Sequence, residues 1–361
     1  MSALPPFLDP RDERPGVRRA LREWLALQAA CVLHPAPAVR RLRAGEGPAE
    51  VRRALADRPG GSAPFDPDAA LACLARLGAR ALPLDSPAYP ERLARLDDAA
   101  PLLLVRGAAG VLAGRSVAVV GARASTAYGR RIAREIGDAL ARAGIVVVSG
   151  LAYGIDAHAH RAALDAGGLG VAILGCGLET VYPAAHRELA ERVAARGALV
   201  TEFPPGFPPL PHHFPHRNRL IAALAESVVV VEARARSGSL STAGRAGAFG
   251  NGRVFAVPGP IDAPASAGTN RLIRDGAHVY TELDDLLQCL GLPLVGSRPR
   301  ERSPTDPGDA VLAALRFAPA TPDELVRRLG RTPEALAADL VRLELEGRVV
   351  RDADGCLRVV S

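Results

Sequence analysis

The sequence predicts an α/β fold built on a doubly wound, mostly parallel sheet, and two observations carry this prediction. Six short apolar runs rich in Val and Ile occupy residues 116–120, 145–149, 170–174, 198–203, 227–233 and 253–257. They are uninterrupted rather than alternating, as expected of strands buried on both faces of a parallel sheet. Helical patterns separate them, at residues 130–143, 156–166, 186–195, 218–225 and 242–249. Strand and helix in regular alternation indicate a Rossmann-like sheet domain over residues 81–290.

Shorter regions flank this sheet on both sides. Residues 1–80 contain short amphipathic helical patterns separated by Pro and Gly, which predicts a small helical domain. Residues 291–308 are polar and proline-rich, as in a linker. Residues 309–361 contain three helical patterns and then a hairpin that turns at Asp354-Gly355. Three helices and a hairpin predict a winged-helix domain.

Composition narrows the cellular setting. No apolar run reaches the roughly 18 residues needed to cross a bilayer, and Pro and charged residues occupy the amino terminus where a signal peptide would be apolar. The five cysteines are scattered and never form a C-x-x-C pair, which argues against a disulfide framework and a zinc site. We therefore expect a cytoplasmic protein without membrane association and without a cofactor.

The charge is mildly basic. The formal net charge is +6, and all 45 basic residues are arginines, since the chain contains no lysine. A planar guanidinium group suits phosphate. Because a complete absence of lysine is typical of genome-wide codon bias, each arginine is weaker evidence for phosphate binding than usual. The charge alone is only a mild indication of a polyanionic partner.

Glycine-rich loops follow five of the predicted strands. The carboxyl ends of parallel strands meet at one edge of a sheet, where glycines and helix starts favour a bound anion. Arg123 and Arg236 add charge there, and hydroxyl groups add further donors. The loops and their polar residues are Gly121–Ser125, Gly150–Gly154, Gly175–Gly177, Arg236–Ser239 and Pro258–Pro260, with Ser125, Ser237, Gly238, Ser239 and Thr242 among them.

A proline-rich segment indicates which phosphate compound binds. The P-loop pattern G-x-x-x-x-G-K-[ST] is absent, and G-x-G-x-x-G does not follow Val120, so neither ATP hydrolysis nor dinucleotide binding is favoured. Phe214 lies just before Arg217, Asn218 and Arg219 at the start of a predicted helix. An aromatic ring beside guanidinium groups can stack a base while the charges hold phosphates, as in single-strand binding. Packing of Phe214 in the core is an equally good interpretation from this residue alone.

Enzyme alternatives have weaker support. Asp156, His158 and His160 invite a metal interpretation, but on a helix only positions 156 and 160 share a face. No serine has a base nearby for acyl transfer. A nucleotide-binding enzyme resembling the phosphoribohydrolases is the best rival, and Glu232 is its candidate carboxylate. Pairing of Glu232 with Arg123 or Arg219 is the simpler interpretation.

Seven linked motifs give the chain a specific resemblance. VAVVGARAST, IVVVSGLAYGIDAHAH, ILGCGLETVYPAAHREL, HFPHRNRLIAALAESVVVVEA, RSGSLSTAGRA, VFAVPG and GTNRLIRDGA occur in the order and spacing of the DNA-processing protein A (DprA/Smf) family. The resemblance covers roughly residues 89–290, and the flanking domains resemble that family's SAM-like and winged-helix domains. It implies a non-catalytic homodimer that coats single-stranded DNA and loads the RecA recombinase during natural transformation.

The resemblance also assigns roles by position. Arg123 matches the phosphate-gripping arginine of the first glycine loop, and Phe214 matches the base-stacking aromatic. Further family pocket positions are Arg187, Arg217, Asn218, Arg219, Ser237, Gly238 and Ser239. Ala122, Arg236 and Ser241 differ from the usual family residues without removing a charge. Residues 34–38 lack the expected glycine-flanked hairpin, which puts DNA contact by the helical domain in doubt.

The predicted second helix of the winged-helix turn is acidic. Residues 333–347 contain Glu334, Asp339, Glu344 and Glu346 against a single Arg342. Acidic charge repels the duplex backbone, from which most DNA-binding affinity comes. This pattern predicts a module for protein interaction or dimerisation rather than a duplex reader.

Overall fold

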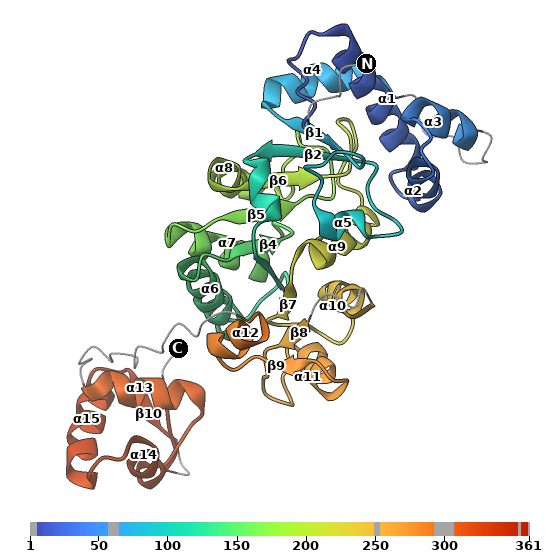
Figure 1. Cartoon of the computed structure of the whole chain (residues 1–361). Helices are drawn as coiled ribbons and strands as arrows, with labels where there is room; N and C mark the ends of the chain where they lie inside the picture. The colour runs from blue at the N-terminus through green and yellow to red at the C-terminus, as the bar shows by residue number, and fades with distance from the viewer. Residues whose placement is uncertain (1–5, 57–64, 249–252, 292–306, 353–354, 360–361) are drawn as a thin grey trace. The chain divides into compact units, whose positions relative to one another are not determined.

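The computed structural model describes residues 6–56, 65–248, 253–291, 307–352 and 355–359 (Figure 1). The chain divides into two compact units, Met1–Val295 and Gly296–Ser361. Most of the predicted linker, and Asp354 of the predicted turn, lie outside the described residues. Within the described segments, no helix has the length and apolarity that a membrane span requires.

A nine-stranded sheet forms the centre of the first unit and confirms the predicted fold class. Its order is β1-β2-β6-β5-β4-β3-β7-β8-β9, and the seven strands from β6 to β9 run parallel. The chain builds outward from β3 to β6 and then returns to add β7 on the other side of β3. The topological switch point therefore lies between β3 and β7. The parallel strands are β3 (Ser116–Val120), β4 (Val146–Ser149), β5 (Gly170–Ile173), β6 (Ala198–Thr201), β7 (Ser227–Val230), β8 (Arg253–Ala256) and β9 (His278–Val279).

Two antiparallel strands extend one edge of the sheet. β2 (Leu102–Gly107) pairs with β6, and β1 (Arg80–Pro83) pairs with β2. The apolar runs predicted neither of these strands, nor the two-residue β9. β1 and β9 are short edge strands, where periodicity over a few residues carries little information. β2 has six residues and lies inside the sheet, and its apolar run Leu102–Val105 was not used to predict a strand.

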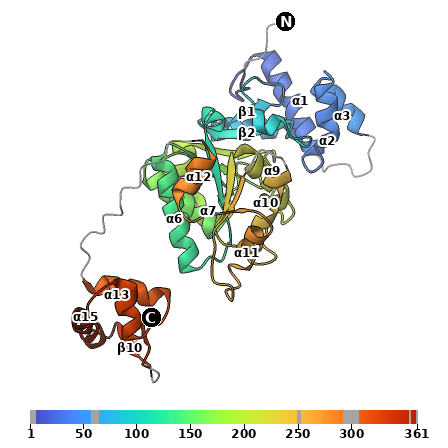
Figure 2. The same cartoon turned by 60° about the horizontal axis from the view of Figure 1, so that its bottom comes forward.

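Helices cover both faces of the sheet (Figure 2). Alternate residues of β3 face opposite layers: Val117 and Val119 pack with α6 and α7, whereas Ala118 and Val120 pack with α9. This alternation follows from the two-residue period of a strand. One layer holds α6 (Ala127–Arg142), α7 (Ile155–Asp165), α8 (Arg187–Arg196) and α12 (Leu283–Cys289), and the other holds α5 (Glu91–Ala94), α9 (His213–Leu224), α10 (Ser239–Ala248) and α11 (Ala267–Arg274).

The amino-terminal helices pack on the antiparallel edge. They are α1 (Pro15–Cys31), α2 (Ala36–Arg43), α3 (Pro48–Ala56) and α4 (Pro67–Leu77). Trp24 and Leu25 of α1 share one hydrophobic cluster with Leu102 and Leu104 of β2. The domain boundary predicted at residue 80 therefore coincides with the change from helix α4 to strand β1. The residues on the two sides of this boundary share one hydrophobic core.

Gln28 links α1 to two strands by buried hydrogen bonds. Its side chain is fully buried. The Nε2 atom donates to the Glu202 carbonyl oxygen over 2.9 Å, and Oε1 accepts from the Leu102 N–H over 2.9 Å. A buried amide must be satisfied in this way, because an unpaired buried polar group costs about 1–3 kcal/mol.

The second unit has its own core and confirms the winged-helix plan. It contains α13 (Pro307–Phe317), α14 (Pro322–Leu329) and α15 (Pro333–Leu345), followed by the antiparallel pair β10 (Val349–Arg351) and β11 (Leu357–Val359). Thr321 and Thr332 cap α14 and α15 through their side chains. Leu325, Leu340 and Leu357 are buried together in one cluster.

We expect Gln28→Ala to lower the free energy of unfolding by about 2–4 kcal/mol, because it leaves the Leu102 N–H and the Glu202 carbonyl without a partner. Urea denaturation of the full chain measures this change. Gln288→Ala is a matched control, since Gln288 is exposed on α12 and its loss should change stability by less than about 0.5 kcal/mol. Equal effects of the two substitutions would contradict the structural role of Gln28.

Candidate nucleic-acid interface

A cavity of about 530 Å³ opens at the switch point of the sheet. Its walls are the loops that follow β3 and β7 together with the start of α9. Ligands of open α/β sheets bind in this position because the loops on either side of the switch point diverge. Residues from four loops or helix starts line the cavity, among them Gly121, Arg123, Ala152, Pro211, Phe214, Arg217, Asn218, Arg234, Arg236, Ser237, Gly238, Ser239 and Thr242.

Phe214 supplies an aromatic ring to this cavity. The Cζ atom of Arg123 lies 5.2 Å from the ring centroid, and that of Arg217 lies 5.9 Å from it. Tyr182 contacts the same ring with centroids 5.3 Å apart. Phe214 also packs on Gly175, where an added Cβ would lie 3.0 Å from the ring. The ring is half-buried and held in place by contacts from three loops.

The turn after β7 forms the second wall. The Asn218 side-chain amide donates to the Gly238 carbonyl over 3.3 Å and to the Ser241 hydroxyl over 3.1 Å. The hydroxyl groups of Ser237 and Ser239 lie 2.8 Å apart. Asn218 therefore holds this turn against α9. Three arginines, Arg123, Arg234 and Arg236, remain exposed around the cavity.

Arg217 forms the floor of the cavity. Its side chain is buried, and Nη1 donates to the carbonyl oxygens of Gly150, over 3.0 Å, and of Ile173. Burial lowers the pKa of Arg217 to about 10, against the opposing field of the Asp156 carboxylate. A Cβ on Gly150 would lie 2.5 Å from the guanidinium group, so a larger residue there would displace Arg217. Arg217 thus combines a structural task with a place in the cavity wall.

Asp156 fixes the loop after β4 rather than capping α7. The N-cap of α7 is Gly154. The Asp156 carboxylate accepts from the N–H groups of Gly150, over 3.1 Å, and Ala152, over 3.3 Å. Burial raises the pKa of Asp156, while the charge of Arg217 opposes that rise. The Asp156 carboxylate therefore bonds across the loop that precedes α7.

The structure places Arg219 apart from the other predicted site residues. Its side chain is fully buried, and its two Nη atoms pair with the Glu202 carboxylate over 2.6 and 2.7 Å. Nη2 also donates to the Asp98 carbonyl over 2.9 Å, and Arg219 does not line the cavity. These contacts assign Arg219 to holding α9 on β6, which corrects its predicted role as a DNA contact.

Two further predicted residues lie outside the cavity lining. The Ser125 carbonyl accepts a hydrogen bond from Arg130 over 2.6 Å at the start of α6. Arg187 is exposed at the first position of α8. Neither residue is among those that line the cavity, so each stays a prediction that depends on the path of a longer ligand.

The structure also locates the residues of the enzyme alternatives. Glu232 accepts from the N–H of Thr126 over 2.9 Å and from its hydroxyl, so its partner is Thr126 rather than Arg123 or Arg219. His160 is fully buried, and burial lowers its pKa to about 4. Among the described residues, no three His, Cys, Asp or Glu side chains gather as a metal site would require. Of the described residues that line the cavity, Asp156 alone carries a carboxylate.

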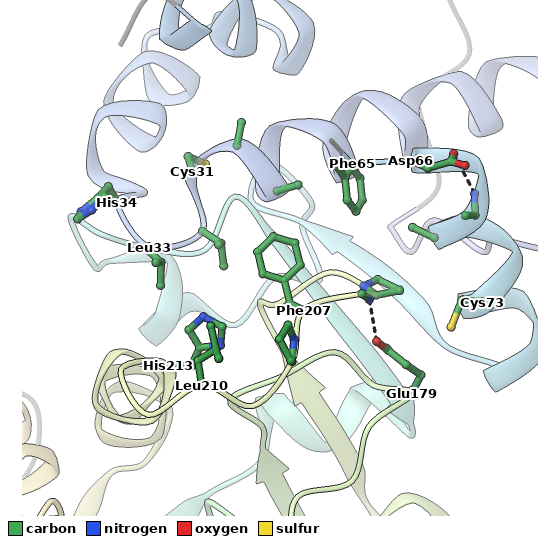
Figure 3. A pocket seen from close by; sticks show the side chains of 18 of the residues that line it. Cys31, Leu33, His34, Phe65, Asp66, Cys73, Glu179, Phe207, Leu210 and His213 are labelled. Atoms are coloured by element: carbon green, nitrogen blue, oxygen red, sulfur yellow. Dashed lines mark hydrogen bonds between the residues drawn. The ribbon is translucent and has the colours of Figure 1, made fainter. Parts of the chain in front are cut away.

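A larger cavity of about 880 Å³ lies between α1, α4 and the loop before α9 (Figure 3). Phe65 and Phe207 point into it. The carboxylates of Asp66 and Glu179 line it, and none of its described lining residues is an arginine. This cavity is therefore larger but less suited to a polyanion than the switch-point cavity, whose lining includes four arginines.

Sequence reasoning missed two aromatic residues near the switch-point cavity. Tyr182, which contacts Phe214, is 43% exposed, and Tyr153, in the loop before α7, is 49% exposed. Large exposed aromatic side chains beside guanidinium groups are typical of single-strand binding. The signal was present in the sequence, since few aromatic residues occur in the chain and these two lie in glycine or proline turns.

Residues 80–291 match the family of the DNA recombination-mediator protein A, and residues 296–355 match the DprA winged helix domain. The chain belongs to the DprA/Smf family. Protein Smf of Escherichia coli K12 is 40% identical over 288 residues, which cover 77% of this chain and 77% of Smf.

Solved structures of the DprA/Smf family agree with this assignment. The crystal structure of DprA from Streptococcus pneumoniae superposes with a TM-score of 0.59 at 37% identity, covering 67% of this chain and 81% of that one. DprA from Helicobacter pylori, whose structure concerns its single-stranded DNA binding mode, gives a TM-score of 0.52 at 29% identity and covers 56% and 92%.

We expect Glu202→Gln to lower the free energy of unfolding by about 3–5 kcal/mol at neutral pH, because it leaves the buried charge of Arg219 with only the partly exposed carboxylate of Asp98, 3.2 Å away, as a charged partner. Replacing both partners, by Glu202→Leu with Arg219→Met, should cost less, since no buried charge then remains. Urea denaturation measures both variants. A double variant as unstable as the single one would contradict a buried ion pair.

The same pair makes stability depend on pH. Burial acts to raise the pKa of Glu202, but the Arg219 charge and the contact with His216 outweigh it and hold the pKa below its ordinary value of 4.5. A lowered pKa in the folded state stabilises the protein above pH 4.5, and this contribution disappears as the pH falls through the lowered value. The difference in unfolding free energy between wild type and Glu202→Gln should therefore narrow below pH 4.5. A constant difference down to pH 3 would contradict the pairing.

Proposed function

We propose that this protein binds single-stranded DNA, with little dependence on base sequence, through the switch-point cavity. The observation that carries the proposal is the Phe214 ring at the switch point of the sheet, whose centroid lies 5.2 Å from Cζ of Arg123 and 5.9 Å from Cζ of Arg217. A base can stack on the exposed part of the ring, and Arg123, Arg234 and Arg236 can contact the neighbouring phosphates. Ser237, Gly238 and Ser239 offer further polar contacts at the start of α10.

A role in recombination is the functional setting that the family supports. The matched family is that of a recombination mediator, and its Helicobacter pylori member is described by its single-stranded DNA binding mode. We propose that the chain protects incoming single strands in the cytoplasm, acts as a homodimer and helps to load RecA. The partner RecA and the dimer rest on the family resemblance.

The proposed role is binding rather than catalysis. A phosphoribohydrolase needs a carboxylate that is free to act in the cavity. Glu232 is 2% exposed and engaged by Thr126, and Asp156 is engaged by two loop N–H groups. These contacts favour a binding site over the enzyme alternative.

We further propose that the winged-helix unit contacts protein rather than duplex DNA. Two of the acidic residues of α15 have ion-pair partners: Asp339 pairs with Arg331 over 2.7 Å, and Glu344 pairs with Arg351 over 3.4 Å. Both arginines come from outside the helix. Val341 and Leu345, one turn apart on α15, are 54% and 84% exposed. An exposed apolar pair suits a protein surface better than a phosphate backbone.

We expect Phe214→Leu to weaken binding of a labelled oligothymidine by about 1–3 kcal/mol, because leucine keeps the packing but loses the stacking face. Arg123→Ala should weaken binding and reduce the slope of log K against log salt by about 0.7, the value of one phosphate contact on a single strand. Fluorescence anisotropy across a salt series measures both. Arg52→Ala is a matched control, since Arg52 is an exposed arginine on α3, away from the cavity.

The same titration with duplex DNA distinguishes the proposed single-strand site from the enzyme alternative. A single strand that binds more tightly than the duplex, with both cavity variants impaired, supports the assigned site. Equal binding of both forms by wild type and variants would place the site elsewhere and revive the nucleotide-processing enzyme.

The winged-helix proposal has a test of its own. We expect the isolated unit, residues 296–361, to show no binding to duplex DNA at physiological salt in a gel-shift assay, because its exposed α15 face offers apolar rather than basic side chains. The unit has its own hydrophobic core and is compact by itself. Micromolar binding to duplex DNA would contradict the proposal.

A further inference from the structure

The first two turns of α6 and α7 carry a group of basic side chains that the switch-point cavity does not use. Arg130 and Arg134 lie one turn apart on α6, and His158 and Arg161 lie in the first two turns of α7. The two helices pack against each other in one hydrophobic cluster. Arg134 Nε lies 3.4 Å from His158 Nδ1, which joins the two pairs. We refer to these four residues as the α6–α7 strip.

The arginines of the α6–α7 strip are not neutralised within the described part of the chain. Arg130, Arg134 and Arg161 form no ion pair there, whereas the acids nearby are already engaged by other arginines. Glu135 pairs with Arg131, Asp138 with Arg142, and Asp165 with Arg192. The strip therefore keeps three positive charges close together. Such a cluster is stabilised when an anion binds to it.

The pKa of His158 reflects the positive charge of the strip. Burial lowers the pKa of His158, and the positive charges of Arg134, Arg161 and Arg130 lower it further. A neutral imidazole at neutral pH accepts the hydrogen bond from Arg134, so the guanidinium group keeps its other N–H donors for a ligand.

The strip continues directly from the switch-point cavity. Arg130 donates to the carbonyl of Ser125 over 2.6 Å, and Ser125 belongs to the loop that carries Arg123. α6 and α7 follow β3 and β4, so their first turns lie at the same sheet edge as the cavity. Tyr153, exposed in the loop before α7, lies at this edge as well. The basic surface thus extends from Arg123 across the starts of two helices.

We propose that a single strand leaving the cavity continues over the α6–α7 strip, whose arginines contact its phosphates. This inference rests on the proposed function and names the path of the bound strand. Four residues of helix rise by about 6 Å, which places Arg130 and Arg134 within reach of successive phosphates. The strip itself has no Phe, Tyr or Trp, and the ring of His158 is hydrogen-bonded to Arg134, so the strip should contact the backbone and add affinity and salt dependence without sequence preference.

The test compares oligothymidines of about 5 and about 25 nucleotides, because the shorter fills the cavity alone and the longer also reaches the strip. The variant is Arg134→Ala with Arg161→Ala in the full chain. We expect roughly three- to tenfold weaker binding of the longer strand and a salt slope lower by about 1.4, that is about 0.7 for each lost phosphate contact. Binding of the shorter strand should stay within about twofold of wild type.

Arg142→Ala with Arg196→Ala is the matched control. Both arginines lie in the last turns of their helices, at the opposite edge of the sheet, and their loss changes the net charge equally. This control should bind both strands as wild type does. Thermal unfolding of each variant confirms that the fold is intact.

The outcomes separate the inference from the proposed function. Unchanged binding of the longer strand by the strip variant, equal losses on both strands, or an equal loss in the control would each overturn the strip as a path for the strand. A loss confined to duplex DNA would also overturn it and assign the strip to duplex binding. Phe214→Leu reports on the cavity by itself: if it weakens neither strand while the strip variant weakens the longer one, the cavity assignment fails and the strip remains.

Discussion

The position of α9 at the switch point is the constraint on which the binding site depends. Two buried arginines hold this helix: Arg219 pairs with Glu202 at the end of β6, and Arg217 donates to the carbonyl oxygens of Gly150 and Ile173. A buried charge is tolerated only when its partners are fixed, because its desolvation costs several kcal/mol. These partners come from the ends of three strands. The helix start that carries Phe214 is therefore fixed relative to the sheet.

This arrangement divides the arginines of the region into two groups. The buried Arg217 and Arg219 position the cavity, while the exposed Arg123, Arg234 and Arg236 are available to a ligand. The N–H donors of the buried pair are engaged by carbonyl and carboxylate oxygens, whereas the exposed guanidinium groups can change rotamer to meet a phosphate. A sequence-independent interaction with a flexible strand needs such adjustable contacts around one fixed stacking platform.

The amino-terminal helices take part in the same framework. Gln28 of α1 donates to the backbone carbonyl of Glu202, whose side chain holds Arg219. One residue at the end of β6 thus connects α1 with α9. The cavity of about 880 Å³ is lined by residues of both α1 and α9. Its wall includes His213, which precedes Phe214 of the switch-point cavity in the sequence. Packing of the helical region and geometry of the proposed binding site are therefore coupled through a short stretch of chain.

The sequence by itself determined the parallel core of the sheet and the edge at which we propose that a ligand binds. Uninterrupted apolar runs indicate buried strands, and the carboxyl ends of parallel strands share one edge of a sheet. The sequence therefore predicted that Arg123, Phe214 and the Ser237–Ser239 turn lie close together. Only the tertiary structure decided that Arg219 turns away to Glu202, that Asn218 holds a turn and that Glu232 pairs with Thr126. It also added β1 and β2 as an antiparallel edge. The reason is physical: the period of a strand is local and is written in consecutive residues, whereas the burial and the partner of a charged side chain depend on contacts between segments far apart in the chain.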